Sequence, residues 1–148
     1  MLGKQLFMLP EIDREKTKAA VESALDMYRF YLLTVPEDHL PKVTASYSLI
    51  PPAFSNQFHS STEQAVVNRV DQELAKKKHI KWVLRGVNRL NKMEREIIYK
   101  RYLEDEEIFD YELYNELGMS ERRYYRIKAR IFYKLAFALK IEQYRHPL

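Results

Sequence analysis

Basic side chains crowd one stretch near the end of this 148-residue sequence. Between Ser120 and Lys140 the stretch contains a single acid, Glu121. Its basic residues are Arg122, Arg123, Arg126, Lys128, Arg130, Lys134 and Lys140. An arginine side chain can donate two parallel hydrogen bonds to a guanine or to a phosphate, whereas a lysine acts as a point charge. Residues of these types at this density therefore favour contact with a nucleic acid.

The segment that leads to these cations carries the signals of two helices separated by a tight turn. Leu113 and Leu117 lie four residues apart, so they share one face of a first helix. Gly118 stands where a helix end needs a residue in the left-handed conformation. Ser120 follows and can accept a hydrogen bond from the start of the second helix. This order predicts a helix-turn-helix.

The second helix would have an apolar face and a basic face. Its apolar residues recur at the spacing that forms one helical stripe. They are Tyr124, Ile127, Ile131, Leu135 and Ala138. At about 100° per residue, a second set falls on the opposite side of the helix. It comprises Arg122, Arg126, Ala129 and Tyr133, with Arg123 and Arg130 beside them.

The basic face predicts a recognition helix for the major groove of double-stranded DNA. Arg122 and Arg126, in the first two turns, would read base edges. Cations at the flank would hold phosphates instead, and they are Arg123, Arg130 and Lys134. The complete set of expected DNA-binding residues is Ser120, Arg122, Arg123, Tyr125, Arg126, Ala129, Arg130, Tyr133 and Lys134. The alternative interpretation is a solvated basic face on an ordinary helical hairpin.

Acidic residues are segregated onto the segment before the turn. No Lys or Arg interrupts the series Glu104, Asp105, Glu106, Glu107, Asp110, Glu112 and Glu116. Catalysis or metal binding is the less favoured reading of the cluster from Glu104 to Glu107, because carboxylate runs are usually solvated. We expect an acidic patch that complements a protein partner or repels non-cognate DNA.

Two segments resemble the C-terminal domain of bacterial sigma factors, which reads the −35 promoter element. They are LNKMEREIIYKRYLEDEE, from Leu90, and DYELYNELGMSERRYYRIKARIFYKLAFAL, from Asp110. From about Leu9 onward, the chain as a whole looks closer to the ArpU-type regulators of late transcription in phages. The segments that carry this similarity are LPEIDREKTKAAVESAL, VPEDHLPKVTASYSLIPPAFSNQFHSSTE and VNRLNKMEREIIYKRYL.

The resemblance implies an activator of phage packaging, structural and lysis genes, with bacterial RNA polymerase as a partner. One departure changes the expected target. The second position of a sigma-type recognition helix is expected to be acidic, but this chain has Arg122 there. A later position, where a glutamine-like residue is expected, is Arg126. The base-reading positions are therefore more basic, and the target need not be a standard −35 sequence.

Composition limits the other classes of function. Hydrophobic residues make up 46% of the chain and charged residues 31%, so a packed core is affordable. Cysteine is absent, and His39, His59, His79 and His146 lack metal-ligand spacing. The three glycines are scattered, so no phosphate-binding loop is expected. We therefore expect no enzyme activity, no metal and no cofactor.

The start of the chain does not have the layout of a membrane or secretion signal. Its apolar run stops at Pro10 and is too short for a membrane span or a signal peptide. No later window is apolar over membrane length. We expect a protein of the bacterial host cytoplasm. The chain is only weakly basic, with a net charge of +4 and a pI near 9.2.

The N-terminal half predicts helices on both sides of a long loop. Asp13 would cap a helix over residues 14–33, and another helix would run from about 62 to 90. The loop, at 36–61, contains several prolines. Within it Val43, Ala45, Tyr47 and Leu49 alternate with polar residues, a pattern that suits a short strand.

The C-terminal half completes an all-α fold. Asn91 and Glu94 form a capping box for a helix over about 94–103. The first helix of the helix-turn-helix would follow over about 109–117. The resulting division of the chain is a helical N-terminal region over 1–86 and a sigma-like helix-turn-helix domain over 87–148.

We therefore expect a sequence-specific DNA-binding regulator of transcription. A true sigma factor is one rival, although the chain lacks room for a second, promoter-melting domain. A small terminase-like DNA-packaging protein is another rival, and a helical interaction protein that never meets DNA is a third.

The end of the last predicted helix needs a cover. After Ile131 it is broadly apolar, at Phe132, Leu135, Ala136, Phe137, Leu139 and Ile141. Either the N-terminal half of the chain or a second subunit must bury these side chains. We expect a homo-oligomer, because a dimer would also place two recognition helices about one turn of DNA apart.

Overall fold

The computed structural model describes residues 11–35, 40–51 and 63–145, except for the side chains of 63–67. The helices are α2 (Arg14–Leu32), α3 (Glu63–Val87), α4 (Lys92–Ile98), the π-helical turn η2 (Tyr99–Leu103), α5 (Asp110–Glu116) and α6 (Glu121–Leu139). A small antiparallel sheet pairs β1 (Lys42–Val43) with β2 (Leu49–Ile50). The prediction of an all-α fold with a short strand in the middle loop is confirmed for the described residues.

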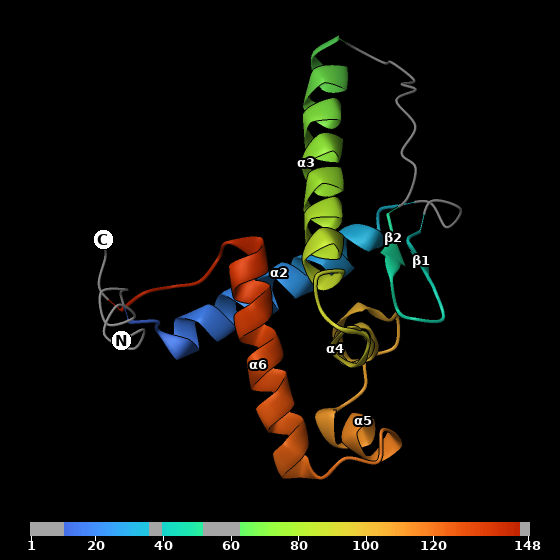
Figure 1. Cartoon of the computed structure of the whole chain (residues 1–148). Helices are drawn as coiled ribbons and strands as arrows, with labels where there is room; N and C mark the ends of the chain where they lie inside the picture. Colours follow the sequence, from blue (N-terminus) through green and yellow to red (C-terminus); the bar gives the residue numbers. More distant parts are fainter. Residues whose placement is uncertain (1–10, 36–39, 52–62, 146–148) are drawn as a thin grey trace.

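α2 crosses α6 and contributes one wall of the core (Figure 1). The side chain of Asp13 caps it by accepting a hydrogen bond from the backbone N–H of Lys16 at 3.0 Å. Its inward face includes Val21, Leu25 and Tyr28, which are all buried. The helix ends at Leu32, within one residue of the predicted boundary.

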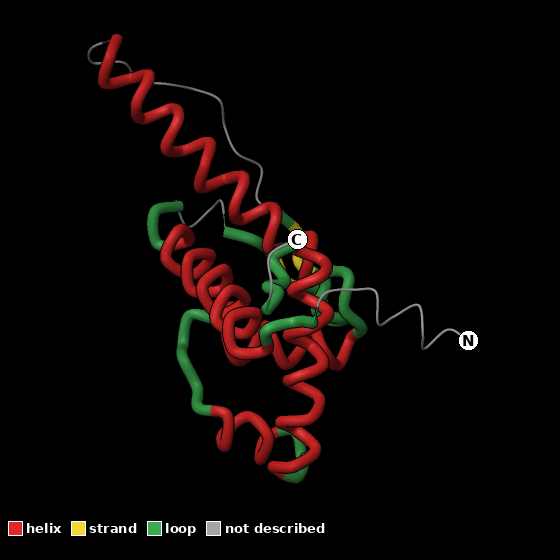
Figure 2. The backbone as a smooth tube through the Cα atoms, turned by 90° about the vertical axis from the view of Figure 1, so that its left-hand side faces the viewer, coloured by secondary structure: helices red, strands yellow, loops and turns green. Residues whose placement is uncertain are grey.

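α3 is the longest of the described helices, and its C-terminal half packs on the other described elements. Figures 1 and 2 show its N-terminal half projecting away from the other helices. The C-terminal half buries Ile80, Val83 and Val87. Gly86 allows α3 to approach α6 closely, because a Cβ there would lie 2.5 Å from Leu139 Cδ2. The helix stops at Val87, a few residues before the predicted end, because Asn91 starts α4 with the predicted capping box.

His79 belongs to the packing between α2 and α3. Its Nε2 lies 2.9 Å from the carbonyl oxygen of Ala24, and its ring lies edge-on to Tyr31 and Trp82. These contacts give His79 a structural role, because they join α2 to α3.

The alternating pattern of the middle loop is split by a turn. Val43 lies on β1 and Leu49 on β2, and Tyr47 between them adopts a positive φ of 59°. Leu49 is consequently the buried member of the pattern, since the turn exposes Ala45 and Val43. The carboxamide of Asn88 pairs with the backbone N–H and C=O of Leu49, both at 2.8 Å. This contact holds the hairpin on the end of α3.

One hydrophobic core joins the two predicted parts of the chain. Its members run from Val21 and Leu25 on α2, through Ile80 and Val83 on α3, to Ala136 on α6. Most of the apolar end of α6 is thus covered within the same chain, by α2 and α3, as one of the two sequence-based alternatives had it, but Phe137 remains exposed. The division at 86 and 87 itself stays a prediction.

The two ends of the described chain are joined by backbone hydrogen bonds. Ile12 forms an isolated antiparallel β-bridge with Tyr144. The backbone N–H of Asp13 donates a hydrogen bond to the carbonyl oxygen of Gln143 at 2.8 Å. The segment after α6 therefore returns to the start of α2 and fixes that end of the helix beside α6.

Candidate nucleic-acid interface

The turn before α6 has the predicted geometry. α5 ends at Glu116, and Gly118 has a positive φ of 68°. Glycine adopts this conformation without a side-chain penalty, so the chain can turn sharply here. Ser120 then caps α6 by accepting a hydrogen bond from the backbone N–H of Arg123 at 3.2 Å. The predicted helix, turn and capped helix are confirmed as local structure.

The inward face of α6 also follows the prediction, with one exception. Its buried members include Tyr124, Ile127, Ile131 and Leu135. The prediction is wrong for Ala138, which is exposed. Near its C-terminal end α6 turns Leu139 inward instead, against Gly86 of α3.

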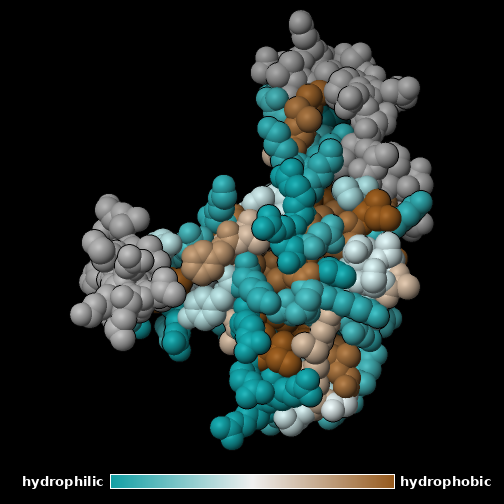
Figure 3. Space-filling view, viewed as in Figure 1, coloured by the Kyte–Doolittle hydropathy of each residue, from teal (hydrophilic) through white to brown (hydrophobic). Residues whose placement is uncertain are grey.

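The outward face of α6 presents the predicted arginines. Arg122, Arg123, Arg126 and Arg130 are all exposed, and none forms an ion pair with a described residue. Tyr125 and Ala129 are exposed beside them, and Tyr133 is half-buried. Figure 3 shows hydrophilic side chains running along α6 in this view. Arginines without acidic partners remain available to a nucleic acid.

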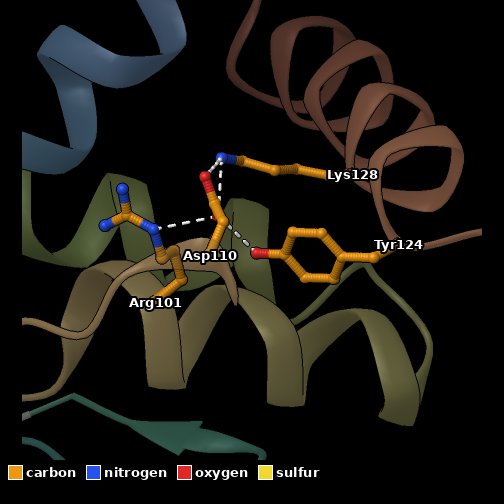
Figure 4. A network of polar contacts seen from close by, with 4 residues as sticks. All are labelled: Arg101, Asp110, Tyr124 and Lys128. Carbon is orange, nitrogen blue, oxygen red and sulfur yellow. Dashed lines mark hydrogen bonds and ion pairs between the residues drawn. The ribbon is translucent and has the colours of Figure 1, made fainter. Parts of the chain in front are cut away.

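Lys128 does not belong to this basic face. It is buried, and its Nζ lies 3.0 Å from both carboxylate oxygens of Asp110. The same carboxylate accepts hydrogen bonds from Arg101 at 3.0 Å and from the hydroxyl of Tyr124 at 2.5 Å (Figure 4). This network joins η2, α5 and α6, so it holds the helix-turn-helix at one angle.

Electrostatics within the network favour the ionised carboxylate. Burial raises the pKa of Asp110, but hydrogen bonds from Tyr124 and Lys128 outweigh it and hold the pKa below its ordinary value. Burial also lowers the pKa of Lys128, against the opposing hydrogen bond to Asp110. Burial and the bond to Asp110 raise the pKa of Tyr124. Tyr124 therefore stays a hydrogen-bond donor at neutral pH.

Lys134, an expected phosphate contact, has a partner inside the protein. Its Nζ lies 2.7 Å from Oε2 of Glu94, and the side chain of Glu94 is only 3% exposed. About half of the Lys134 side chain remains exposed. Its contact with DNA stays a prediction, but Lys134 also connects α6 to α4.

Two depressions border the exposed face of α6 and share Ala129 and Tyr133. The first, the α4 groove, has a volume of about 1000 Å³ and lies between α6 and the junction of α3 with α4. Its charged lining residues are Arg89, Glu94, Arg126, Arg130, Lys134 and Lys140. Of the basic residues in this lining, Arg89 and Lys140 were not among the predicted site residues. Arg89 precedes α4 in the sequence, which gives no signal of its place beside α6, whereas Lys140 ends the basic stretch and directly follows α6.

The second depression, the α2 cleft, has a volume of about 480 Å³ and lies between α2 and α6. Its charged lining residues are Arg14, Lys18, Glu22, Arg101, Asp110 and Lys128. Arg14 and Lys18 were not expected at the site. Their spacing of four residues shows that they share a helix face, but not that this face lies beside α6.

The acidic segment lies between η2 and α5. Residues Glu104 to Glu107 are exposed, and Glu107 forms an ion pair with Arg29 of α2. Arg29 also donates to the backbone carbonyl of Glu104 at 3.1 Å. Among the described residues, no group of three or more acidic, histidine or cysteine side chains is arranged to hold a metal ion.

No helix in the described part of the chain is long and apolar enough to cross a membrane. The fold and the surface around α6 define a mostly helical protein with a helix-turn-helix whose exposed arginines form no ion pair with a described residue.

Comparison with known proteins adds the family. The chain is 32% identical over 136 residues to an uncharacterised phage-related protein of Listeria innocua, a match that covers 92% of this chain and 95% of the relative. It is 29% identical over 141 residues to the protein Gp66 of Listeria phage A118, covering 93% and 96% of the two chains. The chain therefore belongs to the family of these phage-related proteins. No protein-family model and no solved structure matches the sequence.

Proposed function

We propose that this protein binds double-stranded DNA through the outward face of α6 and regulates transcription in a phage. The finer proposal, which rests on the resemblance to ArpU-type regulators, is activation of late genes inside the bacterial host. The observation that carries the proposal is a set of arginines on one face of a capped helix. They are Arg122, Arg123, Arg126 and Arg130, all exposed and without an acidic partner among the described residues.

The positions of the arginines along α6 suit two roles, contact with base edges and contact with phosphates. Arg122 and Arg126 leave its first two turns, where side chains of a recognition helix reach base edges. Arg123 and Arg130 lie beside them and can meet phosphates. Ala129 is exposed and small, so it lets the helix backbone approach the floor of the major groove. None of these roles needs a cofactor or a catalytic step, and we propose no enzyme activity.

A protein partner is the second part of the proposal, with bacterial RNA polymerase as the partner. The acidic segment from Glu104 to Glu107 ends beside two exposed aromatic rings at the start of α5. Phe109 and Tyr111 stack with their centroids 5.8 Å apart. Exposed aromatic side chains next to charged residues suit a protein interface. Co-elution of the protein with polymerase, reduced by Phe109→Ala, would support this contact, and unchanged co-elution would reject it.

A homo-oligomer is the third part of the proposal. The exposed large apolar side chains Phe30 and Leu33, at the end of α2, are available for a second copy. Sedimentation at tens of micromolar should show a species larger than the 17.8 kDa monomer. A monomer alone would reject self-association without affecting DNA binding.

The DNA-binding proposal is tested by affinity as a function of salt. If roughly four to six phosphates are neutralised per subunit, the logarithm of affinity falls with the logarithm of salt at a slope of about −4 to −5. The DNA should be fragments of the phage genome, with promoter regions, packaging sites and scrambled duplexes compared side by side. A flat salt response, or no binding, would overturn the proposal.

The same comparison separates the rival functions. Preference for promoter fragments supports the regulator, whereas preference for packaging sites would make the protein a terminase-like packaging protein. Equal affinity for every duplex would leave a DNA-binding protein without the proposed specificity. Salt-independent association with protein alone would indicate a helical interaction protein.

A further inference from the structure

The α2 cleft brings the first turns of α2 next to the outward face of α6. Arg14 and Lys18 line it from α2, while Tyr125, Ala129 and Tyr133 line it from α6. All three α6 residues belong to the proposed DNA-binding face. A duplex that contacts them would therefore also approach α2.

The position of this part of α2 is determined by hydrogen bonds. The hydroxyl of Thr17 accepts from the backbone N–H of Gln143 at 3.0 Å and lies 3.2 Å from its carbonyl oxygen. The backbone N–H of Asp13 donates to the same carbonyl at 2.8 Å. These bonds attach the start of α2 to the segment that follows α6. Arg14 and Lys18 are thus held beside α6 before any ligand binds.

The cations at the rim of the cleft have no acidic partner in the described part of the chain, whereas those at its floor are neutralised. On the floor, Lys128 and Arg101 share the carboxylate of Asp110. At the rim, Arg14 and Lys18 are exposed and form no ion pair with a described residue. Glu22 is the remaining acid of the lining, one turn of α2 beyond Lys18. The first two turns of α2 therefore present positive charge toward the face of α6.

We propose that Arg14 and Lys18 bind the phosphodiester backbone of one strand of the DNA whose major groove receives α6. The major groove is about 12 Å wide, and a helix with its side chains is about 10–12 Å across. A backbone strand consequently passes on each side of a helix that lies in the groove. The α2 cleft meets one strand, and the α4 groove, with Arg89 and Arg130, meets the other.

α2 is then a second wall of the DNA site as well as a wall of the core. This inference rests on the proposed function, and it assigns DNA contact to the N-terminal half of the chain. The contact is to phosphate, so it adds affinity and fixes the orientation of the duplex but carries no base preference.

A matched pair of variants on one helix tests the inference. Lys18→Ala removes a cation of the α2 cleft, and Lys16→Ala removes an exposed lysine of the same helix that does not line the cleft. Alanine is a good helix former, so both variants should stay folded, which thermal melting verifies. At about 0.15 M salt, Lys18→Ala should weaken binding roughly three- to tenfold on cognate and scrambled duplexes alike, with a salt slope shallower by about one. Lys16→Ala should change affinity less than twofold.

Hydroxyl-radical footprinting supplies a second measurement. The wild-type protein should protect a backbone stretch on each strand, and Arg14→Ala with Lys18→Ala should remove protection from one strand only. Equal effects of Lys18→Ala and Lys16→Ala, or an unchanged footprint, would overturn the inference. If the wild type binds DNA and Arg126→Ala weakens that binding, the proposed function stands even when the α2 variants have no effect. If the wild type does not bind DNA, both proposals are rejected.

Discussion

Lys134 on α6 forms an ion pair with Glu94 on α4, with 2.7 Å between Nζ and Oε2. The side chain of Glu94 is almost completely buried. The other oxygen of Glu94 accepts a hydrogen bond from the backbone N–H of Asn91 at 3.0 Å. Lys134 therefore pairs with the glutamate of the α4 capping box while it lines the α4 groove. One side chain thus contributes both to the stability of the fold and to the charge of the candidate DNA surface.

The first prediction concerns that ion pair. Lys134→Ala leaves the buried carboxylate of Glu94 without a cation, so the free energy of unfolding should fall by about 1–3 kcal/mol. Partial exposure of Lys134 places the effect toward the lower end of this range. Thermal melting should show a loss of about 3–8 °C. Arg130→Ala is the control, because Arg130 is exposed and has no acidic partner among the described residues. Equal melting of the two variants would mean that the pair adds no stability.

The second prediction separates base reading from phosphate contact on α6. Arg126→Ala should weaken binding to the cognate duplex by a factor equivalent to about 1–3 kcal/mol and binding to a scrambled duplex much less. Arg123→Ala should weaken both alike and make the salt slope shallower by about one. Competition binding on the two duplexes measures the difference. A uniform effect of Arg126→Ala would make Arg126 a phosphate contact and would change the orientation of α6 in the groove.

The third prediction concerns Tyr124, whose ring is fully buried and whose hydroxyl donates to Asp110. Tyr124→Ala removes a core aromatic and should lower the free energy of unfolding by about 3–5 kcal/mol. Tyr124→Phe keeps the ring and removes only the hydrogen bond, so the free energy of unfolding should fall by about 1–3 kcal/mol. Urea unfolding of both variants measures these values. The reverse order would contradict a role for the ring in the core.

The fourth prediction concerns acid stability. The pKa of Asp110 in the folded chain lies below its ordinary value of 3.8. A carboxyl with a lowered pKa contributes stability that is present above the ordinary value and is lost as the pH falls through the folded-state value. The wild type should therefore lose this contribution below about pH 4. Asp110→Asn should be less stable than the wild type at pH 7, and the difference should shrink in acid.

Urea midpoints of the wild type and Asp110→Asn, measured from neutral pH down to about pH 2.5, provide the test. The difference between the two curves isolates Asp110, because the other carboxyls titrate in both proteins. A difference that is independent of pH would show that the carboxylate charge does not stabilise the network.

The features that the sequence determined by itself are local. The cap at Asp13, the capping box at Asn91 and Glu94, the left-handed Gly118 and the cap at Ser120 are all present. Each of these interactions spans only a few residues, so the local order of side chains specifies it. The buried and exposed faces of α6 follow from helical periodicity for the same reason, until the last turn, where Ala138 and Leu139 depart from the prediction.

Tertiary structure alone decided which basic residues remain free. Lys128 and Lys134 belong to the basic stretch of the sequence, but each has an acidic partner brought from another helix. Asp110 is 18 residues from Lys128, and Glu94 is 40 residues from Lys134. Helical spacing gives the direction of a side chain around its own axis, whereas pairing depends on which helix packs against that side. The packing of α2 on α6 likewise places Arg14 and Lys18 beside a surface more than a hundred residues away in the chain, since the core that joins these helices forms only when the whole chain folds.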